Sequence, residues 1–226
     1  AAGGKPAGVV FSGVGKTRDE ITEALKAGVG CINLESCEEF ERLESVAANM
    51  TAFVDVAVRV NPNVDPKTHP YIATGLKDSK FGVPINDARE LYQRISSSKW
   101  LNPSGIACHI GSQITIVDPI IEAVGHVVDL ALDLKTIGIQ IETIDVGGGL
   151  GIDYCGETPP TINELVDGLC KTVPAEFKLV LEPGRSIIGP AGLMLTRVEF
   201  IKKTKDKNFV IVDAGMNDLL RPALYD

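Results

Sequence analysis

Residues 144–151 of this chain read IDVGGGLG, and residues 181–185 read LEPGR. Each segment ends an apolar run that is typical of a buried strand, residues 139–146 and 177–181, and each then breaks into glycine. Glycine lets a backbone approach a ligand closely and turn free N–H groups toward an anion. The two segments therefore predict an anionic ligand at the strand ends, with the acid Glu182 and the base Arg185 beside it.

Short apolar runs alternate with helical periodicity along most of the chain. Strands are predicted over residues 8–12, 31–34, 54–60, 105–109, 142–146, 178–181, 193–201 and 208–213. Helices are predicted over residues 18–27, 38–49, 86–97, 118–136 and 162–172. This alternation predicts an α/β fold in which helices cover a parallel sheet.

Two layouts fit this pattern, an open doubly wound sheet or a β/α barrel. Candidate ligand-binding groups lie at or just beyond the ends of five of the first six predicted strands, at Lys16, Arg59, His109, the triple glycine 147–149 and Glu182. An open sheet would gather its ligand-binding groups near one switch point, so the spread favours the barrel. We predict an incomplete (β/α)8 TIM-type barrel of about six βα units over residues 1–190 and the start of a C-terminal β domain over residues 191–226.

Composition excludes several classes of function. A net charge of −8 argues against a nucleic-acid partner, and no apolar run has membrane-spanning length. The five cysteines include no C-x-x-C pair, which predicts reduced, mostly buried side chains rather than a disulfide framework or a metal site. A cytoplasmic location follows, or a plastid in a plant.

Two further segments add candidate site residues. Arg59 is a charge inside an apolar strand, where a guanidinium needs an anion or several acceptors. His109 ends another strand and is followed by Gly111 and Ser112, which offer a backbone donor and a hydroxyl of the kind that phosphate sites use.

In this order, the segments resemble the diaminopimelate decarboxylases, pyridoxal-phosphate enzymes with an alanine-racemase-like barrel. The resembling stretches span nearly the whole chain and are residues 11–17, 59–64, 69–75, 79–82, 109–113, 145–151, 182–185 and 213–225. The resemblance implies decarboxylation of meso-2,6-diaminopimelate to L-lysine and carbon dioxide, as a step of lysine biosynthesis. The protonated pyridine ring of the cofactor serves there as an electron sink.

The same resemblance implies a role for each matching residue. Glu182 resembles the carboxylate that keeps a proton on the ring nitrogen, His109 the residue that stacks on the ring, and Arg59 the residue at its oxygen side. The implied phosphate-binding group is Ser112, Gly148, Gly149, Pro183, Gly184 and Arg185. Arg185, Arg221 and Tyr225 resemble the groups that bind the distal end of the substrate, where a guanidinium suits a carboxylate.

The chain also departs from the family pattern. The family's Schiff-base lysine lies in an Ala-x-Lys-Ala-Asn-like segment, and neither Lys16 nor Lys80 matches it. We therefore expect the chain to be a fragment that is inactive alone. The resemblance implies a homodimer for the full-length enzyme. Two alternatives stay open, a related ornithine- or arginine-type decarboxylase and a non-catalytic module that binds pyridoxal phosphate.

Overall fold

The computed structural model describes residues 3–66, 68, 74–75, 79–154 and 156–225, without the side chains of Pro222 and Tyr225. The chain divides into two compact units, Ala1–Ser186 and Ile187–Asp226. The division at residue 190 into a cofactor-binding part and a β part stays a prediction.

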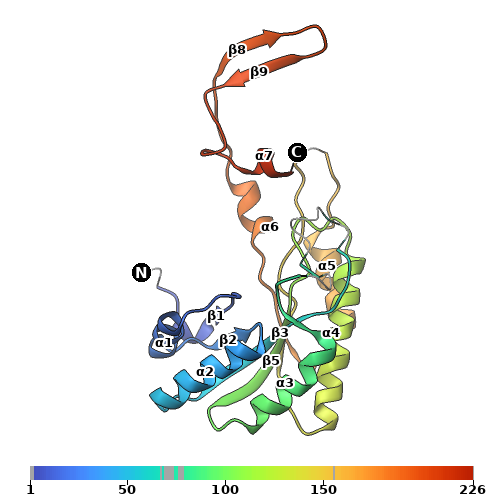
Figure 1. Ribbon diagram of the computed structural model, residues 1–226. Coiled ribbons are helices and arrows are strands. Elements are labelled where there is room, and N and C mark those ends of the chain that lie inside the picture. The colour runs from blue at the N-terminus through green and yellow to red at the C-terminus, as the bar shows by residue number, and fades with distance from the viewer. Residues whose placement is uncertain (1–2, 67, 69–73, 76–78, 155, 226) are drawn as a thin grey trace. The chain divides into compact units, whose positions relative to one another are not determined.

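Parallel strands of the first unit are hydrogen-bonded to one another in chain order (Figure 1). They are β1 (Val10–Phe11), β2 (Cys31–Leu34), β3 (Val54–Asn61), β5 (Leu101–Cys108), β6 (Thr143–Asp145) and β7 (Lys178–Val180). A two-residue strand, β4 (Val83–Pro84), pairs with the end of β3. A doubly wound sheet reverses its strand order at the switch point. The described strands show no reversal, so the predicted partial barrel is confirmed.

Five helices connect these strands, and three have the predicted bounds. They are α1 (Arg18–Ala27), α2 (Cys37–Met50), α3 (Ile85–Ser97), α4 (Asp118–Thr136) and α5 (Ile162–Thr172). Helices α1 and α5 each begin with a capping box, at Thr17 and Thr161. The side chain of each threonine accepts a hydrogen bond from the backbone N–H of the third helical residue. Figure 1 shows α2, α3 and α4 beside the strands that they contact. No helix in the described ranges is long and apolar enough to cross a membrane.

One face of the sheet forms the hydrophobic core beneath the helices. Residues paired in a parallel register share a face, and the row on this face is aliphatic from strand to strand. Its members are inaccessible to solvent and include Ile32, Leu34, Val56, Val58, Ile106 and Ile144. Burial of these side chains is the main stabilisation of the arc of strands.

The opposite, inner face of the sheet is polar and has small residues at its centre. One row across the strands is Asn33, Ala57, Gly105, Thr143 and Lys178. The next row toward the carboxyl ends contains Arg59, Ala107, Asp145 and Val180. A cavity of about 340 Å³ opens on this face, because the central positions have almost no side chain to fill it.

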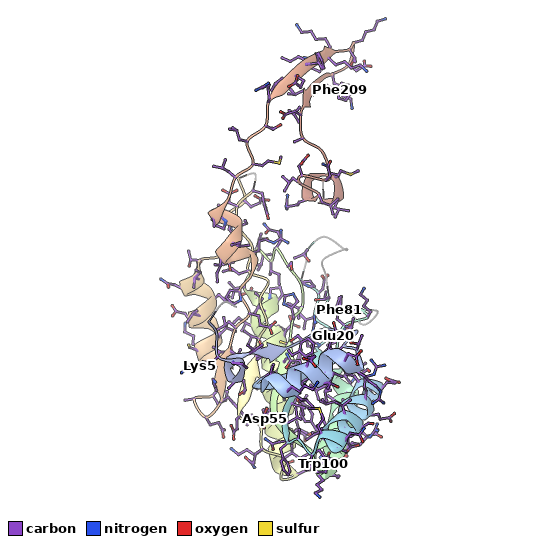
Figure 2. The ribbon with its side chains drawn as sticks, turned by 90° about the vertical axis from the view of Figure 1, so that its left-hand side faces the viewer. Lys5, Glu20, Asp55, Phe81, Trp100 and Phe209 are labelled. Carbon is purple, nitrogen blue, oxygen red and sulfur yellow. The ribbon has the colours of Figure 1, made fainter. Side chains whose placement is uncertain are left out.

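Figure 2 distinguishes the two ends of the strands. Asp55, near the amino end of β3, and Trp100, just before β5, lie in the lower part of that view. Phe81, whose ring contacts Arg59 near the carboxyl end of β3, lies higher. The carboxyl ends form the rim at which the sequence predicts the site.

The second unit contains an antiparallel pair, β8 (Val198–Lys203) and β9 (Asn208–Val212), as predicted for the start of a β domain. The predicted strand 193–201 begins too early, because residues 193–197 lie outside any strand. No helix is predicted in this region, yet α7 (Arg221–Tyr225) forms there. Short helical turns at Pro6–Gly8, Arg185–Ile188 and Gly189–Ala191 are also absent from the prediction.

The prediction that the cysteines are mostly buried is wrong. Cys108 is buried and Cys31 partly so, but Cys37 and Cys170 are exposed. Both exposed residues lie on the solvent side of helices, where a small side chain needs no burial. The four described thiols are free, and Cys155 lies outside the described residues.

A buried hydroxyl joins α3 to two central strands. Tyr92 is fully buried, and its Oη donates a hydrogen bond to the carbonyl of Gly105 at 2.6 Å. The same oxygen accepts one from the N–H of Val58 at 3.1 Å. These bonds bridge β3 and β5 next to the point where the register between them shifts, so the hydroxyl links the two strands at this irregularity.

Replacing Tyr92 by Phe should destabilise the fold by about 1–3 kcal/mol, because two buried backbone groups lose their partner. Urea unfolding followed by circular dichroism measures this change. Ser97→Ala is the matched control, because it removes an exposed helical hydroxyl and should change stability by less than about 0.5 kcal/mol. Equal losses of stability in the two variants would contradict the structural role assigned to the Tyr92 hydroxyl.

Candidate active site

The triple-glycine bend lies between His109 and Glu182. The N–H of Gly148 donates a hydrogen bond to Nδ1 of His109 at 3.2 Å. The N–H of Glu182 donates to the carbonyl of Gly147 at 2.7 Å. The segments that follow β5, β6 and β7 therefore meet at one rim of the sheet.

Backbone packing explains why these positions are glycines. A Cβ on Gly148 would lie 2.3 Å from the carbonyl oxygen of Glu182, and one on Gly149 would lie 2.3 Å from that of Gly111. Gly147 and Gly149 also have φ of +67° and +107°. The sequence interpretation assigned the glycines to close approach of a ligand. The structure shows that they also allow three loops to touch one another.

Arg59 has the anionic partner that its place in an apolar strand requires. Its Nη1 lies 3.4 Å from Oε1 of Glu35, and its guanidinium stacks on the Phe81 ring at 4.9 Å from the centroid. Glu35 is buried and also accepts hydrogen bonds from the N–H groups of Gly13 and Gly82, both at 3.2 Å. These contacts fix the guanidinium at the rim.

Sequence reasoning missed Glu35, although two signals were available. It directly follows a predicted strand, and Arg59 on the neighbouring strand required an anion.

His109 is a neutral imidazole at physiological pH. Burial lowers its pKa to about 4, and the positive charge of Arg59 adds to this effect. Because Nδ1 accepts the Gly148 N–H, the ring proton is assigned to Nε2. The ring is thus held by its backbone contact in one tautomer.

Asp145 is a second carboxyl group that the sequence prediction did not assign to the site. It is buried beside the glycine bend, and its Oδ1 accepts the N–H of Gly147 at 2.9 Å. Burial raises its pKa to about 7, and the negative charge of Glu182 contributes next. Two carboxyl groups therefore share this end of β6 and β7.

The remaining residues predicted for phosphate binding lie on the same rim. Ser112 precedes Gln113, which has φ of +55° and bonds the backbone of Ile152 through both amide atoms at 2.6 and 3.2 Å. This clamp holds the Ser112 loop against the glycine bend. Pro183 and Gly184 are exposed, and the space beside Gly184 is open.

Arg185 begins the turn Arg185–Ile188 and contacts an aromatic residue. Its Nη1 donates a hydrogen bond to the hydroxyl of Tyr154 at 2.9 Å, and its guanidinium lies 5.8 Å from the ring centroid. Tyr154 was not predicted as a site residue.

Two predicted substrate-binding residues belong to the second unit. Arg221 begins α7, and the side chain of Tyr225 lies outside the described residues. Their place in the site stays a prediction. In the resembling stretch 69–75, only residues 74 and 75 are described.

Lys16 is a structural residue. Its ammonium group is buried and pairs with Glu39 at 2.6 Å. It also donates hydrogen bonds to the carbonyls of Gly13 and Asn33 at 2.6 and 2.7 Å. An amine that is bound in this way is not available as a nucleophile.

These features define an α/β barrel protein with a candidate ligand site at the carboxyl ends of its strands. Small inner-face residues leave a cavity below the rim, Glu182 and Asp145 offer carboxyl groups, and the glycine bend brings the loops after β5, β6 and β7 together. The family described as pyridoxal-dependent decarboxylase, pyridoxal binding domain, matches residues 1–189, and the chain belongs to this family.

The relatives are consistent with this membership. A diaminopimelate decarboxylase of Pseudomonas aeruginosa is 50% identical over 226 residues, which is 100% of this chain and 54% of the relative. The crystal structure of diaminopimelate decarboxylase from Helicobacter pylori complexed with L-lysine matches with a TM-score of 0.94 and 43% identity, over 98% of this chain and 56% of that chain. The chain spans about half the length of the curated relatives that it matches.

A more distant structure shares the fold alone. The lysine/ornithine decarboxylase of Vibrio vulnificus, complexed with putrescine, matches with a TM-score of 0.78 but only 19% identity. That match covers 96% of this chain and 55% of the other.

The pKa of His109 gives a direct test of the rim geometry. Its ring resonances should titrate with a midpoint near pH 4, and His109→Gln identifies them by their loss. In the unfolded chain the imidazole has a pKa of about 6.5. The free energy of unfolding should therefore decrease as the pH drops from this value toward the folded pKa of about 4. Arg59→Met should raise the midpoint, because it removes a nearby positive charge. A midpoint near that of a free imidazole would contradict the buried, neutral ring.

Proposed function

We propose that the protein carrying this chain is a pyridoxal-phosphate-dependent carboxy-lyase that converts meso-2,6-diaminopimelate to L-lysine and carbon dioxide. One observation supports this above all: the glycine bend joins His109 and Glu182 at a single rim. The identity of 43–50% to diaminopimelate decarboxylases, against 19% to a lysine/ornithine enzyme, favours this substrate over ornithine.

The cofactor, when bound, supplies a protonated pyridine ring that accepts the electron pair left by the departing carboxyl group. Glu182 would hold the proton on the ring nitrogen, because an adjacent anion favours the charged form. His109, neutral and fixed by Gly148, would stack on the ring without adding a competing positive charge.

Arg59 would lie at the oxygen side of the ring. Its pairing with Glu35 fixes its position before any ligand binds, so less ordering entropy is lost on binding. The phosphate group would be bound by the hydroxyl of Ser112 and by the backbone around Gly148, Gly149, Pro183, Gly184 and Arg185. The exposed rim and the open space beside Gly184 support this assignment.

The distal carboxylate of the substrate would be bound by Arg185, together with Arg221 and Tyr225. A planar guanidinium binds a carboxylate through two parallel hydrogen bonds. Tyr154 already orients one edge of Arg185. Ornithine has an amine in place of that carboxylate, so the same arrangement would reject it.

We also propose that this chain does not turn over substrate by itself and that the active protein is a homodimer. Neither lysine near a strand mouth has the sequence context of the family's Schiff-base lysine, and the amine of Lys16 is bound in an ion pair. A cytoplasmic location stays a prediction from composition.

Glu182→Gln should lower kcat about a hundred- to ten-thousand-fold, because the neutral amide cannot favour a protonated ring. Release of labelled carbon dioxide from meso-diaminopimelate by the protein that carries this chain measures the loss. Glu176→Gln is the matched control at an exposed carboxylate paired with Lys135, and it should leave kcat unchanged. Full turnover by Glu182→Gln would refute the assigned role.

Arg185→Lys should raise the KM for meso-diaminopimelate about tenfold or more, since an ammonium cannot replace the bidentate contact. Tyr154→Phe should raise it less, because it removes only the hydroxyl that orients Arg185. Both variants are assayed with meso-diaminopimelate, ornithine and arginine. Faster turnover of ornithine or arginine than of meso-diaminopimelate by the unaltered protein would favour the alternative decarboxylase.

A further inference from the structure

Asp145 occupies a position on the inner face that structural needs alone do not explain. It ends β6 and pairs in register with Ala107 on one side and Val180 on the other. Only 4% of its surface is exposed. An aspartate is seldom buried to this extent unless its charge is paired or neutralised.

The contacts of the two carboxyl oxygens differ. Oδ1 accepts the N–H of Gly147 at 2.9 Å and thereby supports the turn into the glycine bend. Oδ2 is also buried, but it has no hydrogen-bond partner in the part of the chain that the structure describes. The turn therefore accounts for one oxygen and leaves the other without a role.

Glu182 is the neighbouring residue that could give Oδ2 a hydrogen-bond partner. It lies two residues beyond Val180, the register partner of Asp145, and its N–H donates a hydrogen bond to the carbonyl of Gly147, whose own N–H donates to Asp145. Among the charged groups around Asp145, the carboxylate of Glu182 acts on it most strongly. Asp145 and Glu182 are therefore neighbours on either side of Gly147, and their carboxyl groups interact.

The charges around Asp145 do not balance if every acid there is ionised. Its neighbours on the inner face are Glu182 beyond β7, Arg59 of β3 and the thiol of Cys31 of β2, while the thiol of Cys108 lies on the core face of β5. Asp55, Glu142 and Lys178 line the same cavity, but their side chains are exposed to water. Both thiols are neutral at physiological pH, because burial raises their pKa values to about 11 and about 12. Arg59 is already paired with Glu35, so one of the two remaining carboxyl groups should hold a proton.

We propose that Asp145 is a positioning residue that carries a proton on Oδ2 and donates it in a hydrogen bond to the carboxylate of Glu182. The pair then has a single negative charge, located on Glu182. Burial favours the neutral form at Asp145, and exposure favours the ionised form at Glu182. The donated bond satisfies Oδ2 and limits the orientations of the glutamate.

The effect of this hydrogen bond on cofactor binding rests on the proposed function. One oxygen of Glu182 would be bound by Asp145, which leaves the other for a donor on a bound ring. Two ionised carboxylates at this place would instead repel each other and move Glu182 away from the rim.

Carboxyl NMR titration tests the shared proton without any cofactor. In the full chain labelled at the side-chain carboxyl carbons, one signal should titrate near pH 7 and be absent from Asp145→Asn. Glu182→Gln should lower that midpoint by about one unit, because it removes a neighbouring negative charge. Asp55→Asn is the control, since Asp55 lies at the amino end of the same face and accepts a bond from Asn102 at 2.7 Å. It should leave the signal unchanged.

A titration midpoint of about 4 for Asp145, which is the pKa of an isolated aspartate, would overturn the proposal. A midpoint near 7 that Glu182→Gln does not move would overturn it as well, because burial alone would then explain the shift.

Equilibrium dialysis with pyridoxal phosphate tests the positioning role. Asp145→Asn keeps both a donor and an acceptor, so its Kd should stay within about twofold of the unaltered chain. Asp145→Ala removes the donor and should weaken binding about tenfold. Equal weakening in both variants would overturn the proposal, and circular dichroism identifies any variant that fails to fold. Failure of the unaltered chain to bind pyridoxal phosphate would refute the proposed cofactor site on this chain. The NMR titration would still test the shared proton, because it needs no cofactor.

Discussion

The close contact of three loops at the carboxyl ends of β5, β6 and β7 is the constraint on which the site depends. The glycine bend bonds to His109 on one side and to Glu182 on the other. A Cβ on Gly148 or Gly149 would overlap a backbone oxygen of the neighbouring loop. Any side chain there would separate the loops, and the imidazole and the carboxyl group would move apart. The local backbone geometry therefore fixes the relation between groups that are 73 residues apart in sequence.

Charge pairing is the second constraint, because the inner face contains several ionisable groups with limited access to water. Glu35 neutralises Arg59 and connects it to the loops that contain Gly13 and Gly82. Burial keeps His109 and the thiol of Cys31 neutral at physiological pH. A face with small apolar residues at its centre and paired charges at its rim suits a ligand that has both a flat ring and an anionic group.

The sequence was sufficient for the strands and helices of the partial barrel and for their order along the chain. Hydrophobic periodicity located α1, α4 and α5 because capping residues and apolar faces agree there. It could not locate the partner of Arg59, since Glu35 lies 24 residues earlier and meets it only through the register of β2 and β3. Nor could it assign Asp145, because burial of that carboxyl depends on the curvature of the whole arc. In the second unit the periodic signal is weak, and both the start of β8 and the existence of α7 escaped prediction.

The short side chains at the middle of the inner face set a limit on size. Ala57, Gly105 and Ala107 lie in the two rows below the rim, and none extends beyond a methyl group. Position 105 has little tolerance, since a Cβ there would be 3.2 Å from the carbonyl oxygen of Thr143 and 3.3 Å from the methyl group of Ala57. The depth available beneath the opening is thus determined by backbone and methyl groups, which cannot rotate away as longer side chains do. Because such a floor cannot retreat, a ligand that needs more depth than these two rows leave would be excluded.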